Sequence, residues 1–391
     1  MRLRVTGVRG QARHAGAVLL ASNPALTFAA ARCLRDAGTP FHLVGAGRYP
    51  AVQTMRGCVS STTLASDAFD TVRPEVVALV RQLVQAHPGA VVVPSGMRAT
   101  LFLAGVESLP RSNVFPLSSP SVLLELNDKW RFASLLRRLD IAHPTTVRVD
   151  ALADLGNVDL PFPVIIKPLD ASGQQGVRRV DTRADMERLV RDVSAAKLLP
   201  VLVQPFIPGH DLGVSVLSDH GRVVAHRVQE FKDDGSLAYV EDAEAVEMAR
   251  AVCAATGLHG VANFDFRRDT AAGRLTMLEC NPRLYATAHK SAYSGLNMVD
   301  LGMRLARGDR CQPPETQPTV VLRPSATVRR LVAARSISNI PIASRNAFLA
   351  EVRDPISSLL RGAEWRFPEA FRRVTGNKPK TWETFDSHDR R

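Results

Sequence analysis

The chain has 391 residues, of which 45% are hydrophobic and 23% are charged, and its formal net charge is +12. This length favours two or three lobes over a single core, and the composition excludes a largely disordered chain. The basic balance invites a nucleic-acid interpretation, but the arginines are spread through amphipathic segments, which favours an anionic small substrate instead.

The N-terminal segment and the cysteines bear on where the protein works. The five cysteines are scattered without CxxC pairing, so they predict neither a disulfide framework nor a zinc site, and a reducing cytoplasm fits best. No apolar run reaches the roughly 18 to 20 residues that span a bilayer. The basic leader before "AGAVLLASNPALTFAAA" imitates a signal peptide, but the same pattern recurs downstream, so a strand followed by a helix is predicted.

From Ala17 to about Pro116, short apolar runs alternate with amphipathic stretches. Strands are predicted over "AVLLA", "FHLVG" and "AVVVPSG", and helices over "ALTFAAARCLRDAG" and "VVALVRQLVQAHPG". This alternation predicts an α/β lobe with a parallel sheet covered on both faces. Ligands of such sheets bind beyond the carboxyl ends of the strands. Four polar residues fall there, where capping of the following helices is the alternative role: Ser22, Asn23, Ser95 and Arg98.

The middle of the chain has longer elements. One helix is predicted over "PLSSPSVLLELNDKWRFASLLRRLDIAHP", with Ser119 as its cap, ending near Asp140. Strands are expected over "VIIK", "VLVQPF", "GVSVLSD" and "RVVAHRVQEF", and helices over "RADMERLVRDVSAAK" and from near Glu241 to Thr256. A hairpin is expected over "ANFDFRRDTAAGRLTMLECNPR". The proline-rich "CQPPETQP" is typical of a linker, and the remainder carries no motif that indicates a function.

The predicted hairpin concentrates acidic side chains on one face. Because side chains alternate along a strand, Glu279 and Asn281 share a face and Cys280 takes the other. With a turn near Ala272, Asp265 lies opposite Glu279, and opposed carboxylates are destabilising unless a cation lies between them. Magnesium takes one or two carboxylates and completes its shell with water and substrate phosphates. Asp265, Glu279 and Asn281 therefore predict a magnesium–nucleotide site, with a solvated polar face as the alternative.

The stretch "IIKPLDASGQQGVRRV" sets a lysine before two glycines. Gly173 and Gly176 allow successive backbone N–H groups to turn towards an anion, which makes a phosphate-binding concavity. Lys167, at the end of an apolar strand, can reach the same phosphates as a point charge. An ordinary hairpin is the alternative, and the order of lysine and glycines is not that of a P-loop.

Taken in order, four segments carry a resemblance that covers about Pro116 to Asp300. They are "NDKWRFASLLRRLDIAHPTT", "FPVIIKPLDASGQQGV", "VLVQPFIPGHDLGVSVL" and "GVANFDFRRDTAAGRLTMLECNPRL". With them the sequence resembles the ATP-grasp superfamily, in particular its carbamoyl-phosphate-synthase-like and carboxylate–amine ligase members. The resemblance implies an α/β ATP-grasp fold with a Rossmann-like domain over 1–115, a cap subdomain with its linking helix over 116–200, a subdomain with a metal-bearing antiparallel sheet over 201–310, and an extension of unknown role over 311–391.

The same resemblance implies roles for individual residues. Lys129 and Lys167 would hold the nucleotide phosphates, and the loop that closes over them would use Ser172, Gly173, Gln174 and Gly176. The hinge beside adenine would be Gln204, Pro205, Phe206 and Ile207, and Asp211 would hold the ribose hydroxyls. Asp265, Glu279 and Asn281 would bind one or two Mg²⁺ ions, and Arg283 would act with Lys167 on the transferred phosphate. Because Pro205 stands where many relatives have a glutamate, ATP in place of GTP is an expectation.

The implied reaction is activation of a carboxylate by ATP as an acyl phosphate, followed by attack of an amine and release of ADP and phosphate. Tyr285, His289 and Lys290 are candidates for recognition of the carboxylate, and Lys232 is a further one. The expected partners are a small-molecule carboxylate and an amine, with no nucleic acid and no membrane, and a homodimer is left open. A carbamoyl-phosphate-synthase- or carboxylase-like enzyme and a non-catalytic nucleotide-binding module are the alternatives.

Overall fold

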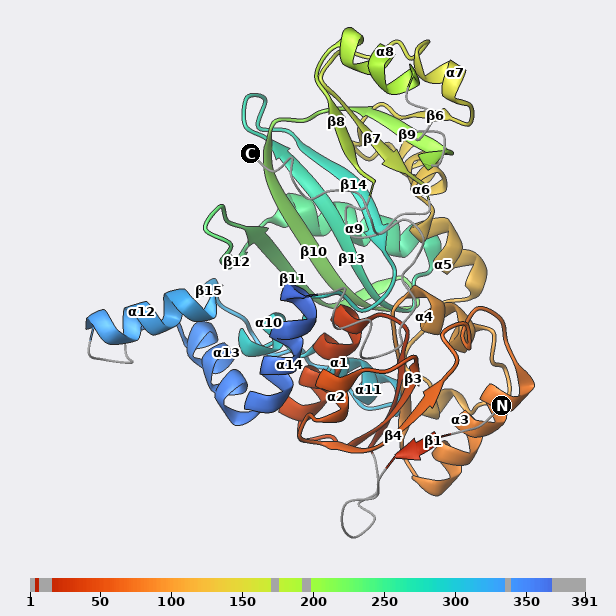
Figure 1. The fold of residues 1–391 in the computed structure, drawn as a ribbon, viewed down its shortest axis with the longest axis vertical. Helices are drawn as coiled ribbons and strands as arrows, with labels where there is room; N and C mark the ends of the chain where they lie inside the picture. Colours follow the sequence, from red (N-terminus) through yellow and green to blue (C-terminus); the bar gives the residue numbers. More distant parts are fainter. Residues whose placement is uncertain (1–3, 7–15, 170–175, 192–197, 335–338, 368–391) are drawn as a thin grey trace. The chain divides into compact units, whose positions relative to one another are not determined.

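A computed structural model of the chain describes residues 4–6, 16–169, 176–191, 198–334 and 339–367 (Figure 1). The described residues form two compact units. The first comprises those of Met1–Leu123, Gly213–Asn263 and Asn281–Lys378, and the second those of Leu124–Leu212 and Phe264–Cys280. Three sheets and the helices around them make a mixed α/β fold, which confirms the predicted fold class. None of the described helices is both long and apolar enough to cross a membrane.

The N-terminal part of the first unit is built on a five-stranded sheet in the order β1-β4-β3-β2-β5. Its strands are β1 Arg4–Thr6, β2 Ala17–Ala21, β3 Phe41–Ala46, β4 Cys58–Leu64 and β5 Val91–Ser95. Strands β2, β3 and β5 are parallel, as predicted; β4 is parallel to β3, and β1 pairs antiparallel with β4 at the edge. Sequence patterning did not predict β4, whose "CVSSTTL" has too few apolar residues to stand out.

Helices bury both faces of this sheet. They are α1 Pro24–Asp36, α2 Pro50–Gln53, α3 Pro74–Ala86 and α4 Met97–Ala104, with a short 3-10 turn at Arg111–Asn113. Adjacent residues of β2 enter different cores: Leu19 packs with Leu34 of α1, whereas Leu20 packs with Val80 of α3. Burial on both faces explains why β2 is continuously apolar and not alternating.

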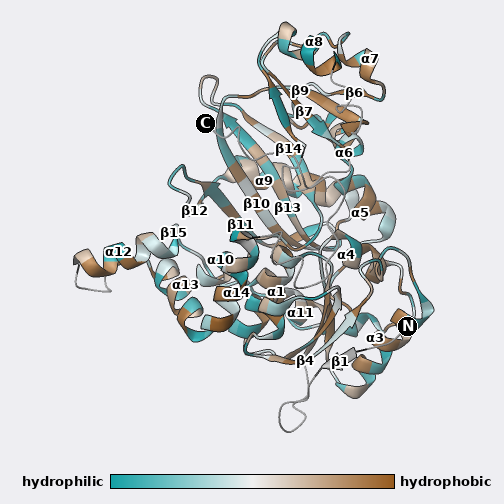
Figure 2. Cartoon of the chain, viewed as in Figure 1, coloured by the Kyte–Doolittle hydropathy of each residue, from teal (hydrophilic) through white to brown (hydrophobic). Residues whose placement is uncertain are grey.

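The second unit contains a four-stranded antiparallel sheet in the order β6-β9-β7-β8. Its strands are β6 Val147–Val149, β7 Val164–Pro168, β8 Arg178–Val180 and β9 Val201–Pro205, and its short helices are α7 Leu152–Leu155 and α8 Arg183–Arg191. The apolar residues of β7 and β9 stand out in Figure 2, and their buried members include Val164, Ile166 and Val203. These side chains pack against Met186 of α8, which fixes the helix over the sheet.

The long helix predicted from Ser119 to Asp140 is wrong in one respect, because it is two helices, α5 Pro120–Asn127 and α6 Lys129–Arg138. The break falls at Asp128, whose side chain accepts a 2.8 Å hydrogen bond from the N–H of Arg131 and so caps α6. In a continuous helix the N–H of Arg131 would donate to a backbone carbonyl, whereas here the side chain of Asp128 accepts that hydrogen bond. The new helix start places Lys129 in its first turn.

A six-stranded sheet follows in the order β14-β13-β10-β11-β12-β15. Its strands are β10 Gly209–Asp219, β11 Arg222–Phe231, β12 Leu237–Val240, β13 Gly260–Asp269, β14 Leu275–Asn281 and β15 Thr319–Val321, and the helices of this region are α9 Ala243–Thr256, α10 Ala288–Tyr293 and α11 Met298–Ala306. The predicted hairpin of β13 and β14 is confirmed. Its turn is closed by hydrogen bonds from Asp269 N–H to the carbonyl of Arg274 (2.9 Å) and from Gly273 N–H to the carbonyl of Asp269 (2.9 Å).

The segment predicted as a linker is held by a buried arginine. Arg227 of β11, which is 4% exposed, donates to Thr316 Oγ1 (2.7 Å) and to the carbonyl of Gln317 (2.8 Å). Its guanidinium carbon lies 4.7 Å from the centroid of the Tyr239 ring. These contacts fix the "CQPPETQP" segment beside the sheet, so it is not a loose tether.

Beyond the linker, the first unit ends in three helices, α12 Pro324–Ala334, α13 Ile342–Arg353 and α14 Pro355–Arg366. Two of them, α13 and α14, are bonded to α1 through Arg32, whose side chain is fully buried. Its Nη2 donates to Glu351 Oε2 (2.9 Å) and to Ser358 Oγ (2.7 Å), and its Nη1 donates to the hydroxyl of Tyr293 (3.0 Å). The C-terminal helices are therefore part of the first unit's packing.

Candidate functional site

Lys167 on β7 lies among several charged residues of the second unit. Burial lowers the pKa of Lys167, and Lys129 acts in the same direction. Glu279, Asp265 and Asp211 oppose that shift and raise the pKa, with Glu279 the strongest of the three. The structure thus brings Lys129 and three predicted acidic site residues within electrostatic reach of Lys167, although they come from separate parts of the sequence.

Lys129 enters this cluster from the first turn of α6. Its Nζ donates to the carbonyl of Leu169, 3.4 Å away, directly before the predicted glycine-rich loop. Lys129 lowers the pKa of Lys167 because like charges repel. Binding of a polyphosphate by this pair stays a prediction.

Asp265 and Glu279 lie on the two strands of the β13–β14 hairpin and are both half-buried. Cys280, beside Glu279, is buried, so the strand alternates as predicted. The N–H of Met277 donates to the carbonyl of Ala142 (2.9 Å), which anchors β14 to the segment between α6 and β6. A carboxylate from each strand therefore acts on the amine of Lys167.

Asn281 and Arg283 follow at the end of β14. Arg283 turns back on the strand, with its N–H donating to the carbonyl of Asn281 (2.8 Å) and Nη2 donating to Asn281 Oδ1 (2.8 Å). A further bond runs from Nη1 to the carbonyl of Leu284 (3.3 Å). The guanidinium therefore orients the amide oxygen that was predicted as a metal ligand, and the role of each residue towards phosphate stays a prediction.

The predicted adenine hinge has well-defined partners. Gln204 is 4% exposed, and its Nε2 donates to Thr146 Oγ1 (2.9 Å), so its amide bridges β9 to the segment before β6. The N–H of Phe206 donates to the carbonyl of Pro163 (2.8 Å). Pro205 ends β9. Adenine recognition by this hinge stays a prediction. The amide of Gln204 and the N–H of Phe206 already donate hydrogen bonds within the protein, so an adenine base would compete for them.

Arg267 is a site residue whose role sequence reasoning missed. From β13 it donates to the carbonyl of Ile207 and pairs with Asp211, with 2.5 Å between Nη1 and Oδ1. Its guanidinium carbon also lies 5.2 Å from the centroid of the Phe206 ring. One side chain therefore ties the hinge to the acid predicted to hold ribose. The signal available was its place two residues after Asp265 on the same strand face.

The glycine-rich loop is described only at its end. Ser172, Gly173 and Gln174 lie outside the described residues. Gly176 is described and has a φ of +69°, a conformation that L side chains rarely adopt. A Cβ there would also come within 2.8 Å of Pro168 Cγ. Glycine is therefore required at this point by the backbone itself, independently of any ligand.

The candidates for carboxylate recognition lie in the first unit. Tyr285 is 5% exposed, and burial raises its pKa to about 12. His289 meets the rings of Phe28 and Tyr293 edge-on, and burial lowers its pKa well below the usual value. Burial also lowers the pKa of Lys290. These surroundings are those of interior residues, and contact of any of them with a substrate stays a prediction.

Lys232 has a different setting, because its Nζ lies 2.6 Å from Glu230 Oε2 in a partly exposed ion pair.

The polar residues at the ends of β2 and β5 serve the local structure. Asn23 caps α1 by accepting from the N–H of Leu26 (3.1 Å), and Ser22 Oγ donates to the carbonyl of Ser95 (3.0 Å). Arg98 pairs with Asp70. Asn23 is therefore a helix cap, and Ser22, Ser95 and Arg98 make other local contacts.

Comparisons with known proteins extend these observations. Residues 197–328 match a family model described as "ATP-grasp in the biosynthetic pathway with Ter operon". The chain is 24% identical over 258 residues to the carbamoyl phosphate synthase large chain of Thermoanaerobacter sp. (strain X514), a match over 58% of this chain and 24% of that one. It is 29% identical over 198 residues to a D-alanine–D-alanine ligase of Acidiphilium cryptum, over 44% of this chain and 64% of the ligase.

Among solved structures, the fold is similar to that of N5-carboxyaminoimidazole synthase from Aspergillus clavatus, solved in complex with ADP and 5-aminoimidazole ribonucleotide. The TM-score is 0.61 at 18% identity, and the likeness covers 83% of this chain and 87% of the other. At this identity the likeness concerns the fold. The chain spans about a quarter of the length of the curated carbamoyl phosphate synthase large chains it matches, with 24% for the one named above.

Proposed function

We propose that this chain, part of which matches an ATP-grasp family model, is an ATP-dependent ligase that activates a carboxylate as an acyl phosphate and joins it to an amine. The observation that carries the proposal is the electrostatic cluster around Lys167, to which Lys129, Asp211, Asp265 and Glu279 contribute. Paired ammonium groups beside paired carboxylates suit a polyphosphate accompanied by a divalent cation. ATP is expected as the nucleotide.

In this proposal the second unit holds the nucleotide. Lys129 and Lys167 bind the phosphates, and the hinge around Phe206 and Ile207 lies beside the base. Asp211, 52% exposed at its side chain, is accessible to the ribose hydroxyls while it stays paired with Arg267. The glycine-rich loop would cover the phosphates and exclude water from them.

The residues present suit a magnesium ion. Asp265 and Glu279 are carboxylates close enough to the amine of Lys167 to oppose the lowering of its pKa. Asn281 Oδ1 is an amide oxygen that accepts a hydrogen bond from Arg283. Hard oxygen donors of this kind are the ligands that Mg²⁺ takes, together with phosphate oxygens and water. When bound, the ion would neutralise charge on the outer phosphates of the nucleotide. One or two ions fit this donor set.

The reaction then needs positioning and charge neutralisation more than proton transfer. A substrate carboxylate oxygen attacks the γ-phosphorus of ATP, the bond from that phosphorus to the bridging oxygen breaks, and ADP leaves. The amine then attacks the acyl carbon, phosphate leaves, and the amine loses a proton. The cations of Lys167 and Arg283 offset the charge that develops on the transferred phosphoryl group.

A second candidate is favoured by the matches to carbamoyl phosphate synthase large chains. In that reading the activated carboxylate is bicarbonate, and the enzyme is of the carbamoyl-phosphate-synthase or carboxylase type. A non-catalytic nucleotide-binding module is a weaker alternative, because the sequence keeps the full set of Asp265, Glu279, Asn281 and Arg283.

The test is ADP release by the full chain with ATP and Mg²⁺ against pooled amino acids, other small carboxylates, amines and bicarbonate, with mass spectrometry of the product. A new amide with stoichiometric ADP supports the ligase. ADP release that depends on bicarbonate alone would favour the second candidate. Tight ATP binding with no ADP release from any pool would leave only the binding module.

The cysteines bear on the cellular compartment in which the reaction takes place. All five cysteines are free thiols, which suits the reducing cytoplasm, and we place the enzyme there. Its partners would be small molecules, and a homodimer is compatible with the proposal. Nucleic-acid binding is not expected. An affinity for DNA or RNA that fell steeply with salt would contradict that expectation.

A further inference from the structure

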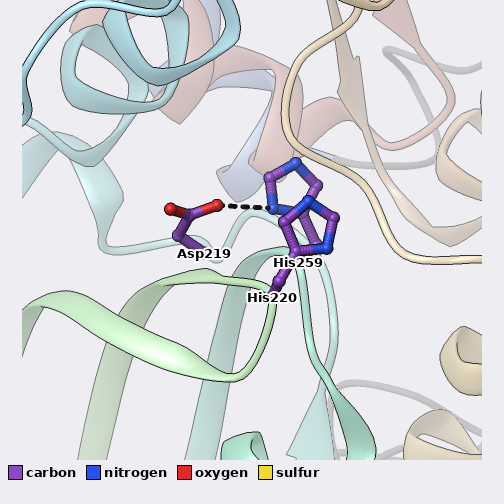
Figure 3. A group of neighbouring side chains, drawn as sticks. All are labelled: Asp219, His220 and His259. Carbon is purple, nitrogen blue, oxygen red and sulfur yellow. Dashed lines mark ion pairs between the residues drawn. The ribbon is translucent and has the colours of Figure 1, made fainter.

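Three metal-ligating side chains meet in the first unit, outside the proposed nucleotide site. Asp219 ends β10, His220 follows it in the turn to β11, and His259 directly precedes β13. Each offers one ligand atom, and these atoms lie within 4.8 Å of one another. Figure 3 shows the carboxylate directed at one imidazole while the second imidazole lies over the first.

The backbone beneath this cluster is fixed from both sides. The N–H of Gly221 donates to the carbonyl of Leu258 (2.8 Å), which ties the β10–β11 turn to the segment after α9. The N–H of His259 donates to Ser118 Oγ (2.8 Å), and that hydroxyl donates back to the carbonyl of His259 (3.3 Å). The residues that carry the three side chains are therefore held at a defined separation.

The side chains lie against one another. The rings of His220 and His259 are stacked, with centroids 4.0 Å apart and an interplanar angle of 8°. Nδ1 of His259 is buried and makes no hydrogen bond with the described residues, although Asp219 Oδ1 lies 3.4 Å from it. The other carboxylate oxygen lies 3.3 Å from Arg222, whose side chain is 76% exposed and can turn away into solvent.

The buried nitrogen of His259 also points to a ligand. A buried polar atom without a hydrogen bond is costly, and a bound ion would satisfy Nδ1 of His259.

We propose that Asp219, His220 and His259 bind a divalent ion of the zinc class, with water in the fourth position. Two imidazoles and a carboxylate suit Zn²⁺ and its neighbours in the transition series, whereas Mg²⁺ prefers oxygen ligands alone. In a tetrahedral site with ligands at about 2.1 Å, the ligand atoms lie about 3.4 Å apart, so the exposed ring of His220 would have to rotate out of the stack to close the site. The ion would fasten the β10–β11 turn to the connection between α9 and β13.

The test is a Zn²⁺ titration of the full chain after chelator treatment, in the presence of excess Mg²⁺ that occupies oxygen-ligand sites. One equivalent is expected to bind. Asp219→Asn and His259→Gln should each weaken binding at least about 100-fold, beyond the roughly 10- to 100-fold cost of losing an outer-shell partner. His226→Gln is the matched control, because His226 is an exposed histidine on the adjoining strand β11 and should leave binding unchanged.

Two further measurements keep the outcome decisive. Zn²⁺ should raise the thermal midpoint of the unaltered chain and of His226→Gln, but not that of Asp219→Asn. Bound Co²⁺ should show visible d–d absorption without the near-ultraviolet band of a cobalt thiolate. If His259→Gln does not fold, His220→Gln replaces it, since His220 is exposed in a turn. No tight zinc, binding equal in all variants, or a thiolate band from the free cysteines would overturn the proposal.

Discussion

Arg267 gives the sharpest prediction, because one side chain joins the hinge carbonyl of Ile207 to the carboxylate of Asp211. We expect it to act as a positioning residue that orders both groups before ATP binds. Replacement by methionine keeps much of the packing against Phe206 and removes the charge and its hydrogen bonds. The hinge carbonyl and the acid would then lose their common partner.

The size of the effect follows from the exposure of each contact. A hydrogen bond from a charged donor contributes about 1.5–3 kcal/mol. The pair with Asp211, which is 52% exposed, adds only about 0.2–1 kcal/mol because water screens it. The sum is about 2–4 kcal/mol. At about 1.4 kcal/mol per tenfold, the lower end corresponds to a roughly 30-fold loss of ATP affinity if all of it serves to order the site.

The assay is ATP titration by calorimetry, together with the KM for ATP and kcat once a substrate is known. Arg267→Met should raise Kd and KM for ATP while kcat changes much less, and Arg267→Lys should restore part of the affinity because it keeps a cation. The midpoint of urea unfolding serves as the control for a merely structural role. Equal ATP affinity in the three proteins, or a loss matched only by general destabilisation, would refute the positioning role.

Three further predictions follow from the same contacts. Glu279→Gln should abolish carboxylate-dependent ADP formation while circular dichroism stays unchanged, and full turnover in this variant would remove the metal assignment. Because burial lowers the pKa of Lys167, its cation is lost at a lower pH than that of an exposed lysine. ATP affinity should therefore fall as pH rises through that pKa, and calorimetry across pH should show no such fall for Lys167→Arg. Glu351→Ala leaves the buried guanidinium of Arg32 without its counter-charge, so urea unfolding should report a loss of about 3–5 kcal/mol; a loss below about 1 kcal/mol would contradict this.

The sequence was sufficient for those parts of the fold where one physical signal dominates. Continuous apolar runs in the N-terminal region predicted parallel strands buried on both faces, and Leu19 and Leu20 are indeed buried in two different cores. Period-two alternation predicted the β13–β14 hairpin on which Asp265 and Glu279 lie. The lysine and acidic residues named for the nucleotide site lie in one electrostatic cluster around Lys167.

Other parts depended on partners that are distant in sequence. Asp128 ends one helix and begins another because its side chain competes with the backbone, and this competition is invisible to helical periodicity. Arg267 looks like a surface arginine until Ile207 and Asp211 are placed beside it. The anchoring of the proline-rich segment required Arg227, 89 residues before Thr316, which no local pattern relates to it.

The buried guanidinium of Arg32 has a consequence for anyone who shortens this protein. A version cut after Cys311 would keep every residue proposed for catalysis, yet it would remove Glu351 and Ser358 and leave the buried cation with the hydroxyl of Tyr293 and without its counter-charge. The minimal functional fragment is therefore larger than its chemistry suggests, and deletion of the final helices should yield insoluble material instead of a slower enzyme.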